Sequence, residues 1–366
     1  MNNSRLITRR SVLWGGTSLA LATPFIHAVP AKADAGEITI ASWGGARTTA
    51  MREVMFTPFE KATGIKVRDD GPPEAAKVKA MADSGNVTWD LLDTDIPAIL
   101  GMMNEDLLEP IDYSRLTKSR LDQIPEVLRQ PYALGHLIYS FNILYNTNTY
   151  PDGSHPKSWA DVWNGEAFKG ARSFGFRGGL SPDLEAALLA DGVALDSIYP
   201  IDVDRAWNSM NRLRPLVTKW YSNHAEAIQL LSSGEIDICS SIGPRGVTAA
   251  REGAPIGVEY SGGKMAPDNW AIVKGSQNLD AVHQFIDFAI DGEIQGALAK
   301  LIPYGPSSQA AFEHLTPDQA KDLNTSPDNI AKQFWTDVDW WGAVAENGKT
   351  NTQNQVDYFA RWMLKG

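Results

Sequence analysis

The chain has 366 residues, of which 43% are hydrophobic and 21% charged, a globular composition with enough length for two lobes and a leader. Its formal net charge is −11 and its pI about 5.1, and such an acidic surface argues against nucleic acid as a partner. After the leader, no stretch reaches the roughly 18 apolar residues of a membrane-spanning helix.

Residues 1–35 have the features of a cleaved export signal. Arg9 and Arg10 precede a short apolar stretch, and small residues suited to cleavage follow, with cutting expected near Ala33 or Ala35. An N-terminal anchor helix is the alternative, but about 15 apolar residues are short for a span. The paired arginines favour the twin-arginine route, so we expect the mature protein in the periplasm.

A strand, a glycine turn, a helix and a second strand are predicted between residues 38 and 67. β-branched residues at 38–40 favour a strand, and Gly44-Gly45 allows a tight turn. The βαβ pattern predicts a parallel sheet, in which ligands bind at the carboxyl ends of strands. Trp43 stands at such an end and is therefore a candidate wall of a ligand site.

Pro58 interrupts the helix predicted over residues 46–63. A proline inside a straight helix removes a hydrogen bond and clashes with the preceding turn. The sequence around it predicts a fresh helix start, with Thr57 as the N-cap and Glu60 completing a capping box.

The rest of the chain alternates between predicted strands and helices, without internal repeats or long linkers. Strands are expected over 89–93, 171–176, 236–241 and 269–273, and helices over 75–81, 96–103, 159–163, 183–190, 207–216, 225–231, 246–252 and 281–290. The residues Tyr304-Gly305-Pro306 predict a tight turn. This alternation favours an α/β fold with two lobes and several crossings between them.

Catalytic and metal-binding motifs are absent from the sequence. It contains no G-x-S-x-G, H-E-x-x-H or Walker A pattern, and its histidines have no partner at metal-ligand spacing. Cys239 is the only cysteine, so no intramolecular disulfide can form. We expect Cys239 to be a buried core residue. We expect no cofactor and no metal. A secreted enzyme remains the alternative, with catalytic groups among Asp93, Asp95, Asp268 and the histidines.

Polar and aromatic residues next to predicted strand ends form the candidate ligand site. These residues are Trp43, Asp95, Arg177, Arg245, Asp268 and Tyr304. Arg245 begins a predicted helix, where free backbone N–H groups and a guanidinium would together attract an anion. An exposed or structural arginine is the alternative for both Arg177 and Arg245.

Several motifs resemble the polyamine-type (spermidine/putrescine) solute-binding proteins of bacterial ABC importers. They are Ser42-Trp43-Gly44-Gly45, the run Phe59 to Val67, the run His155 to Trp163, and Ser233-Gly234-Glu235-Ile236-Asp237. The resemblance implies a periplasmic-binding-protein type II fold, an ABC permease as partner, and a monomer.

The same resemblance implies how the chain divides into lobes. Residues 36–140 and 268–312 would form the first lobe, and residues 141–267 and 313–366 the second. The crossings between them are expected at Tyr139–Asn142, near Pro267 and after Tyr304.

Individual ligand residues follow from the resemblance too. Asp268 matches the aspartate that binds a ligand amine, and Trp43 and Tyr304 match aromatic residues of the cleft. The sequence departs from the family at residues 177–182, where an acidic subsite is missing, and at Ile242 and Ala266, where tryptophans are missing.

These departures bear on the ligand. A buried arginine requires an anion as a buried cation requires a carboxylate. Asp268 together with Arg245 therefore predicts a small solute with both an amine and a carboxylate, such as an amino acid or γ-aminobutyrate. A true putrescine or spermidine receptor is the alternative.

Overall fold

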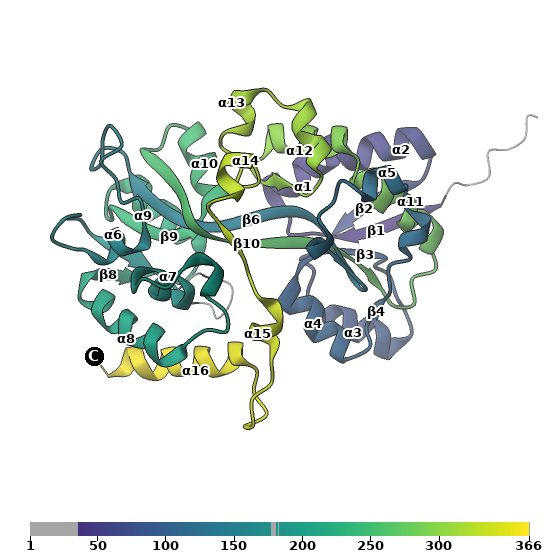
Figure 1. Cartoon of the computed structure of the whole chain (residues 1–366). Helices are drawn as coiled ribbons and strands as arrows, with labels where there is room; N and C mark the ends of the chain where they lie inside the picture. Colours follow the sequence, from purple (N-terminus) through teal and green to yellow (C-terminus); the bar gives the residue numbers. More distant parts are fainter. Residues whose placement is uncertain (1–35, 177–180, 182, 366) are drawn as a thin grey trace, which may run out of the picture. The chain divides into compact units, whose positions relative to one another are not determined.

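The computed structural model describes residues 36–176, 181 and 183–365 (Figure 1). The predicted export signal and Arg177 lie outside these residues. Within them, we find no helix whose length and apolar character would let it cross a membrane.

The predicted alternation of strands and helices is present throughout. The strands are β1 (Glu37–Ala41), β2 (Lys66–Asp70), β3 (Leu91–Asp95), β4 (Leu108–Glu109), β5 (Arg129–Gln130), β6 (Ala133–Asn146), β7 (Arg172–Phe174), β8 (Val217–Trp220), β9 (Ile238–Ile242), β10 (Ile256–Val273), β11 (Gly305–Pro306) and β12 (Phe334–Trp335). The α-helices are α1 (Gly45–Met51), α2 (Thr57–Thr63), α3 (Ala75–Ser84), α4 (Ile96–Asn104), α5 (Lys118–Leu121), α6 (Trp159–Trp163), α7 (Asp183–Ala190), α8 (Val203–Leu213), α9 (His224–Ser233), α10 (Gly243–Arg251), α11 (Leu279–Ala289), α12 (Gly292–Leu301), α13 (Pro317–Ala320), α14 (Pro327–Ile330), α15 (Val338–Gly342) and α16 (Asn351–Leu364).

The strands form one mixed sheet in the order β2-β1-β3-β10-β6-β9-β7-β8. β1 pairs in parallel with both β2 and β3, which confirms the predicted βαβ unit. β10 is antiparallel to β3 on one side and to β6 on the other. β7 is parallel to β8 and β9, so parallel strands flank a central antiparallel pair.

The two central strands, β6 and β10, run side by side and connect two sets of elements (Figure 1). The second half of β6 pairs with β9, whereas its first half pairs with β5 and β11. The last part of β10 pairs with β3. Each strand is therefore long enough to contribute side chains to two different cores.

The two largest hydrophobic cores of the described residues lie around β1 and β7. The first contains Phe59, Trp270 and Phe285, packed edge to face. The second contains Trp159 and Trp207, together with aromatic residues of α15 and α16. A fold with two lobes needs a separate core for each lobe, and these two cores meet that requirement. The residues at which one lobe ends and the other begins stay a prediction.

The paired tryptophans of α6 pack in the second core, as their i, i+4 spacing predicted. The rings of Trp159 and Trp163 are 6.4 Å apart, and Trp163 donates its indole N–H to the Ser209 carbonyl oxygen at 3.0 Å. Helix α16 packs on α8, with the rings of Trp362 and Trp207 5.5 Å apart.

The predicted helix restart at Pro58 is wrong. Phe56, not Thr57, precedes α2, and it has helical φ and ψ without a side-chain cap. A π-helical segment, Arg52–Phe56, joins α1 to α2. The wider π turn moves carbonyl groups away from the proline ring, so the helix continues through Pro58. Glu60 instead accepts a hydrogen bond from the Val67 backbone at 2.8 Å.

Two other local predictions are corrected by long-range pairing. The tight turn expected at Tyr304-Gly305-Pro306 is the short strand β11, which pairs with Ile138 and Leu137 of β6. β3 begins and ends two residues later than expected, and its last residue, Asp95, caps α4 by accepting from the Ala98 N–H at 2.9 Å. In both cases pairing with a strand distant in sequence determines which residues form the strand: β6 for β11, and β10 for β3.

Candidate functional site

A cavity of about 800 Å³ lies where β1, β3 and β9 end, above the middle of β6 and β10. Strand ends meet there with the first turns of α1 and α10, so the position is that expected from the sheet topology. Of the predicted ligand residues, those that line this cavity are Trp43, Asp95, Arg245, Asp268 and Tyr304. Arg177 lies outside the described residues.

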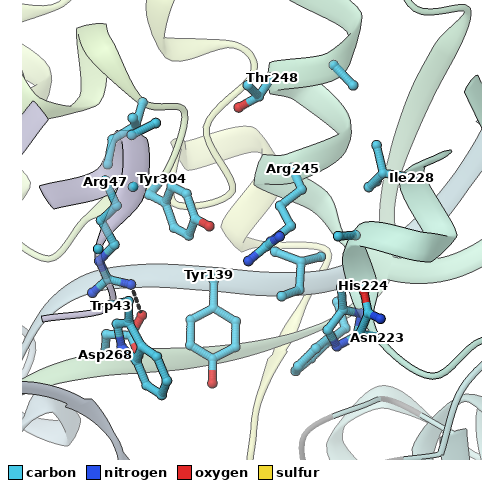
Figure 2. Close-up of a pocket in the computed structure, with 18 of the residues that line it drawn as sticks. Trp43, Arg47, Tyr139, Asn223, His224, Ile228, Arg245, Thr248, Asp268 and Tyr304 are labelled. Atoms are coloured by element: carbon cyan, nitrogen blue, oxygen red, sulfur yellow. Dashed lines mark hydrogen bonds and ion pairs between the residues drawn. The ribbon is translucent and has the colours of Figure 1, made fainter. Parts of the chain in front are cut away.

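Aromatic side chains form the walls and part of the floor of the cavity (Figure 2). Trp43 is 46% exposed, which is unusual for a tryptophan and leaves surface for a ligand to cover. It is followed by Gly44 and Gly45, whose φ angles of 77° and 62° are left-handed, so glycine is needed at this turn. Tyr139 and Phe141 of β6 pack edge to face in the floor.

Two buried carboxylates beside the cavity share one arginine. Arg47 of α1 donates to Asp268 at 2.5 Å and also to Asp93. The side chains of Arg47, Asp93 and Asp268 are only 12%, 0% and 7% exposed, respectively. Arg47 and Asp268 line the cavity, whereas Asp93 lies behind them. We call these three residues the cavity cluster.

Further groups hold Asp93 in place. His136 Nε2 lies 2.9 Å from Asp93 Oδ1 and must donate, because a carboxylate only accepts. The Ser42 hydroxyl donates to the other oxygen at 3.1 Å. The His136 ring stacks on Trp270 with 3.9 Å between centroids. Asp93 is therefore held by Ser42, which follows β1, and by His136 of β6, whose ring packs on Trp270 of β10.

The pKa values of the two carboxylates are shifted in opposite directions, although Arg47 lowers both. Burial would raise the pKa of Asp93, but the charge of Arg47 and the contact with His136 outweigh it, and the net pKa is lowered. Burial raises the pKa of Asp268, and Asp93 adds to this effect while Arg47 opposes it. The pKa of Arg47 is raised although burial lowers it, because both carboxylates favour the charged guanidinium.

Sequence reasoning missed Arg47, although the signal was present. Arg47 and Arg245 are each the third residue of a helix that begins with a glycine shortly after a strand. The argument that singled out Arg245 applies equally to Arg47. The ion pairs themselves could not be read from the sequence, because Arg47 is separated from Asp93 by 46 residues and from Asp268 by 221.

Arg245 occupies the opposite side of the cavity and faces Tyr304 (Figure 2). It is exposed, and among the described residues no carboxylate lies within ion-pair distance of it. Burial raises the pKa of Tyr304, against the influence of the Arg47 and Arg245 charges. Arg245 therefore offers an unneutralised positive charge to a ligand in this cavity.

Two of the positions at which the sequence departs from polyamine binders, Ile242 and Ala266, lie at this cavity. Ile242 lines the cavity beside Arg245, and Ala266 packs with Tyr139 and Phe141 in its floor. Glu252, which sequence reasoning also missed, lines the side formed by α10. Smaller side chains at 242 and 266 leave room that a tryptophan would fill.

Two further titratable residues, Cys239 and His155, belong to the scaffold. Cys239 is buried, and burial alone raises the pKa of its thiol. His155 contacts Glu259 at 3.2 Å and stacks on Tyr145, at a position that does not line the cavity. Within the described part of the chain, no group of three His, Cys, Asp or Glu residues is arranged to hold a metal ion.

Comparison with known proteins agrees with this architecture. Residues 54–328 match the family model of the bacterial extracellular solute-binding proteins, and the chain belongs to that family. A γ-aminobutyric acid-binding protein of Pseudomonas aeruginosa is 31% identical over 320 residues, covering 86% of this chain and 89% of the relative. The spermidine/putrescine-binding periplasmic protein of Escherichia coli K12 is 27% identical, covering 75% of this chain and 79% of the relative.

Solved structures of similar proteins identify the fold class. The crystal structure of an ABC transporter substrate-binding protein from Bradyrhizobium japonicum is 33% identical, with a TM-score of 0.80, over 88% of this chain and 99% of that one. The predicted fold class, type II of the periplasmic solute-binding proteins, is confirmed. The chain is a solute-binding protein, and its family and relatives are transport proteins rather than enzymes.

Proposed function

We propose that this protein is the receptor of an ABC importer and binds a small zwitterion, an amino acid or γ-aminobutyrate, in the cavity between Asp268 and Arg245. The observation that carries the proposal is the charge on the two sides. The cavity cluster has two carboxylates for one guanidinium, whereas Arg245 has no carboxylate partner among the described residues. An ammonium group suits the first side and a carboxylate the second. The γ-aminobutyric acid-binding relative supports this assignment.

Trp43 and Tyr304 would cover the carbon chain of such a ligand. Trp43 is half exposed, and Tyr304 stands between the two charged sides. Asp95 would contribute as the cap of α4 at the edge of the cavity. Arg177 would add a second positive charge, as its place in the sequence predicts.

A second candidate is a diamine. Glu252 lines the cavity on the side of Arg245 and would provide a second carboxylate for putrescine. The E. coli relative has spermidine and putrescine in its name, and it supports this alternative. Glu252 is exposed, however, so water screens it more than the buried carboxylates.

We further propose how the receptor works in the cell. The export signal is cleaved near Ala33 or Ala35 after passage through the twin-arginine route. The mature protein acts as a monomer in the periplasm, where its two lobes close on the solute and present it to a membrane permease. It performs no chemistry on the solute.

A ligand screen tests the proposal. The mature chain is melted with γ-aminobutyrate, each of several amino acids, putrescine and spermidine. A ligand at about 100 times its Kd stabilises the folded state by about 2.7 kcal/mol. We expect stabilisation by a zwitterion that is recovered unchanged. Stabilisation by putrescine or spermidine alone would assign the chain to the polyamine receptors, and chemical conversion of the added solute would make it an enzyme.

A further inference from the structure

We propose that Arg47 is a built-in counter-cation that limits the amine-binding side of the cavity to one ammonium group, which makes it a specificity-determining residue. This inference rests on the proposed function, since it explains how the receptor discriminates a zwitterion from a diamine. Arg47 would act through Asp93 and Asp268 rather than by holding the ligand itself.

The first step of the argument is a count of charges. When both carboxylates are ionised, the two of them and the one guanidinium leave the cavity cluster with a net charge of −1. Their side chains are at most 12% exposed, so neutralising the negative charge with a cation from the solvent would require that ion to lose most of its hydration, which is unfavourable. One ammonium group of a ligand would neutralise the cluster, and a second would leave it positive.

His136 does not alter this count. Its Nε2 donates to Asp93, and its Nδ1 is buried without a hydrogen-bond partner among the described residues. Protonation at Nδ1 would bury an unsatisfied donor that carries a charge, and this is unfavourable.

The geometry directs the surplus charge toward the ligand. Arg47 uses one terminal nitrogen for each carboxylate, so Asp93 is neutralised behind the cavity wall. Asp268 lines the cavity and shares the same guanidinium. The guanidinium carbon of Arg47 lies 6.0 Å from the centre of the Tyr304 ring, which places the cluster against the aromatic wall.

Removal of the counter-cation should change which ligand binds. With a dication bound, both carboxylates of Arg47→Met would be ionised and the cluster would carry two negative charges, so putrescine should bind about tenfold more tightly or better. In the double variant Arg47→Met with Asp93→Asn, the net charge returns to −1, and selectivity for γ-aminobutyrate over putrescine should be recovered. Isothermal titration calorimetry with both ligands measures these changes.

Arg52→Met is the matched control. Arg52 belongs to the same continuous helix but pairs with Glu60 and Asp69 on its outer side, away from the cavity. Its loss should change neither affinity. A gain in putrescine binding in Arg52→Met would attribute the effect to overall charge and overturn the inference.

Other outcomes separate the inference from the function on which it rests. If the unmodified protein selects γ-aminobutyrate and folded Arg47→Met gains no putrescine affinity, the inference fails and the proposed function stands. If Arg47→Met does not fold, the double variant decides, and its failure to bind γ-aminobutyrate when folded overturns the inference. Tight binding of putrescine but not γ-aminobutyrate by the unmodified protein would overturn both.

Discussion

Two buried clusters in this chain each combine one basic with two acidic side chains, and they differ in what lies next to them. The cavity cluster borders the ligand cavity. The other, which we call the core cluster, consists of Lys264, Glu185 and Asp183, all at most 1% exposed. The Lys264 ammonium lies 2.7 Å from Glu185, and the same carboxylate accepts from Tyr199 and Trp341 at 2.6 and 2.9 Å. Aromatic side chains therefore enclose the core cluster.

The two clusters differ in how their second carboxylate, which the single basic residue does not neutralise, is accommodated. Burial raises the pKa of Asp183 to about 8, with Glu185 adding to the effect, so a proton neutralises the core cluster at neutral pH. The cavity cluster keeps Asp268 at a surface that a ligand can reach. An excess charge in an enclosed core is removed by a proton, whereas at a cavity it becomes available to a cationic ligand.

The largest expected effect is on stability and distinguishes the two clusters. Lys264→Met leaves the Glu185 carboxylate buried without its cation, and we expect a loss of about 3–5 kcal/mol in the free energy of unfolding. Arg47→Met should lose less, because Asp93 keeps its hydrogen bonds to His136 and Ser42 and Asp268 borders the cavity. Urea unfolding of both variants measures the difference. Equal losses would contradict a distinction based on access to the cavity.

The second effect is on affinity. Arg245→Ala should weaken γ-aminobutyrate binding by about 2–5 kcal/mol, or roughly 30-fold to several thousand-fold, because the ligand carboxylate loses its charged partner. Asp268→Asn should cause a similar loss at the amine end. Calorimetry with a diamine is the control, since its affinity should fall in Asp268→Asn but not in Arg245→Ala. Unchanged zwitterion binding in Arg245→Ala would make Arg245 a surface residue.

The third effect is a pH dependence of stability that arises from Asp183 in the core cluster. The folded pKa of Asp183, about 8, lies above its unfolded value of about 3.9, so the folded state binds the proton more tightly. The resulting stabilisation is complete below the unfolded pKa and is lost as the pH rises toward 8. The slope is at most about 1.4 kcal/mol per pH unit.

Asp183→Asn should remove that slope, because the amide stays neutral at every pH. Urea unfolding between about pH 5 and pH 8 compares the variant with the unmodified protein. Parallel stability curves for the two proteins would show that Asp183 is ionised in the folded state, and the contrast between the clusters would then be lost.

The smallest effect concerns the aromatic wall. Trp43→Ala should weaken ligand binding by about 1 kcal/mol through lost contact with the carbon chain. Its side chain is 46% exposed, so the melting temperature without ligand should hardly change. A large loss of stability would instead place Trp43 in the scaffold of the turn at Gly44.

The sequence by itself determined the class of fold and most of the elements. Alternation at Ile38 and Ile40 marked β1, and the i, i+4 tryptophans of α6 marked a buried helix face. These signals are local, because the periods of strands and helices are set by the backbone. The rule that ligands bind at strand ends placed Trp43 and Arg245 at one cavity. Asp268 lines the same cavity from inside β10, so that rule does not account for it.

Only the tertiary structure decided which of these groups pair. Pro58 is accommodated by a π turn, and Asp268 shares an arginine with Asp93, and neither outcome follows from local sequence. The contact between Arg47 and Asp268 spans 221 residues and exists because β1, β3 and β10 are neighbours in the sheet. A charge pattern in sequence does not specify an ion pair, because the pairing depends on which strands the fold places side by side.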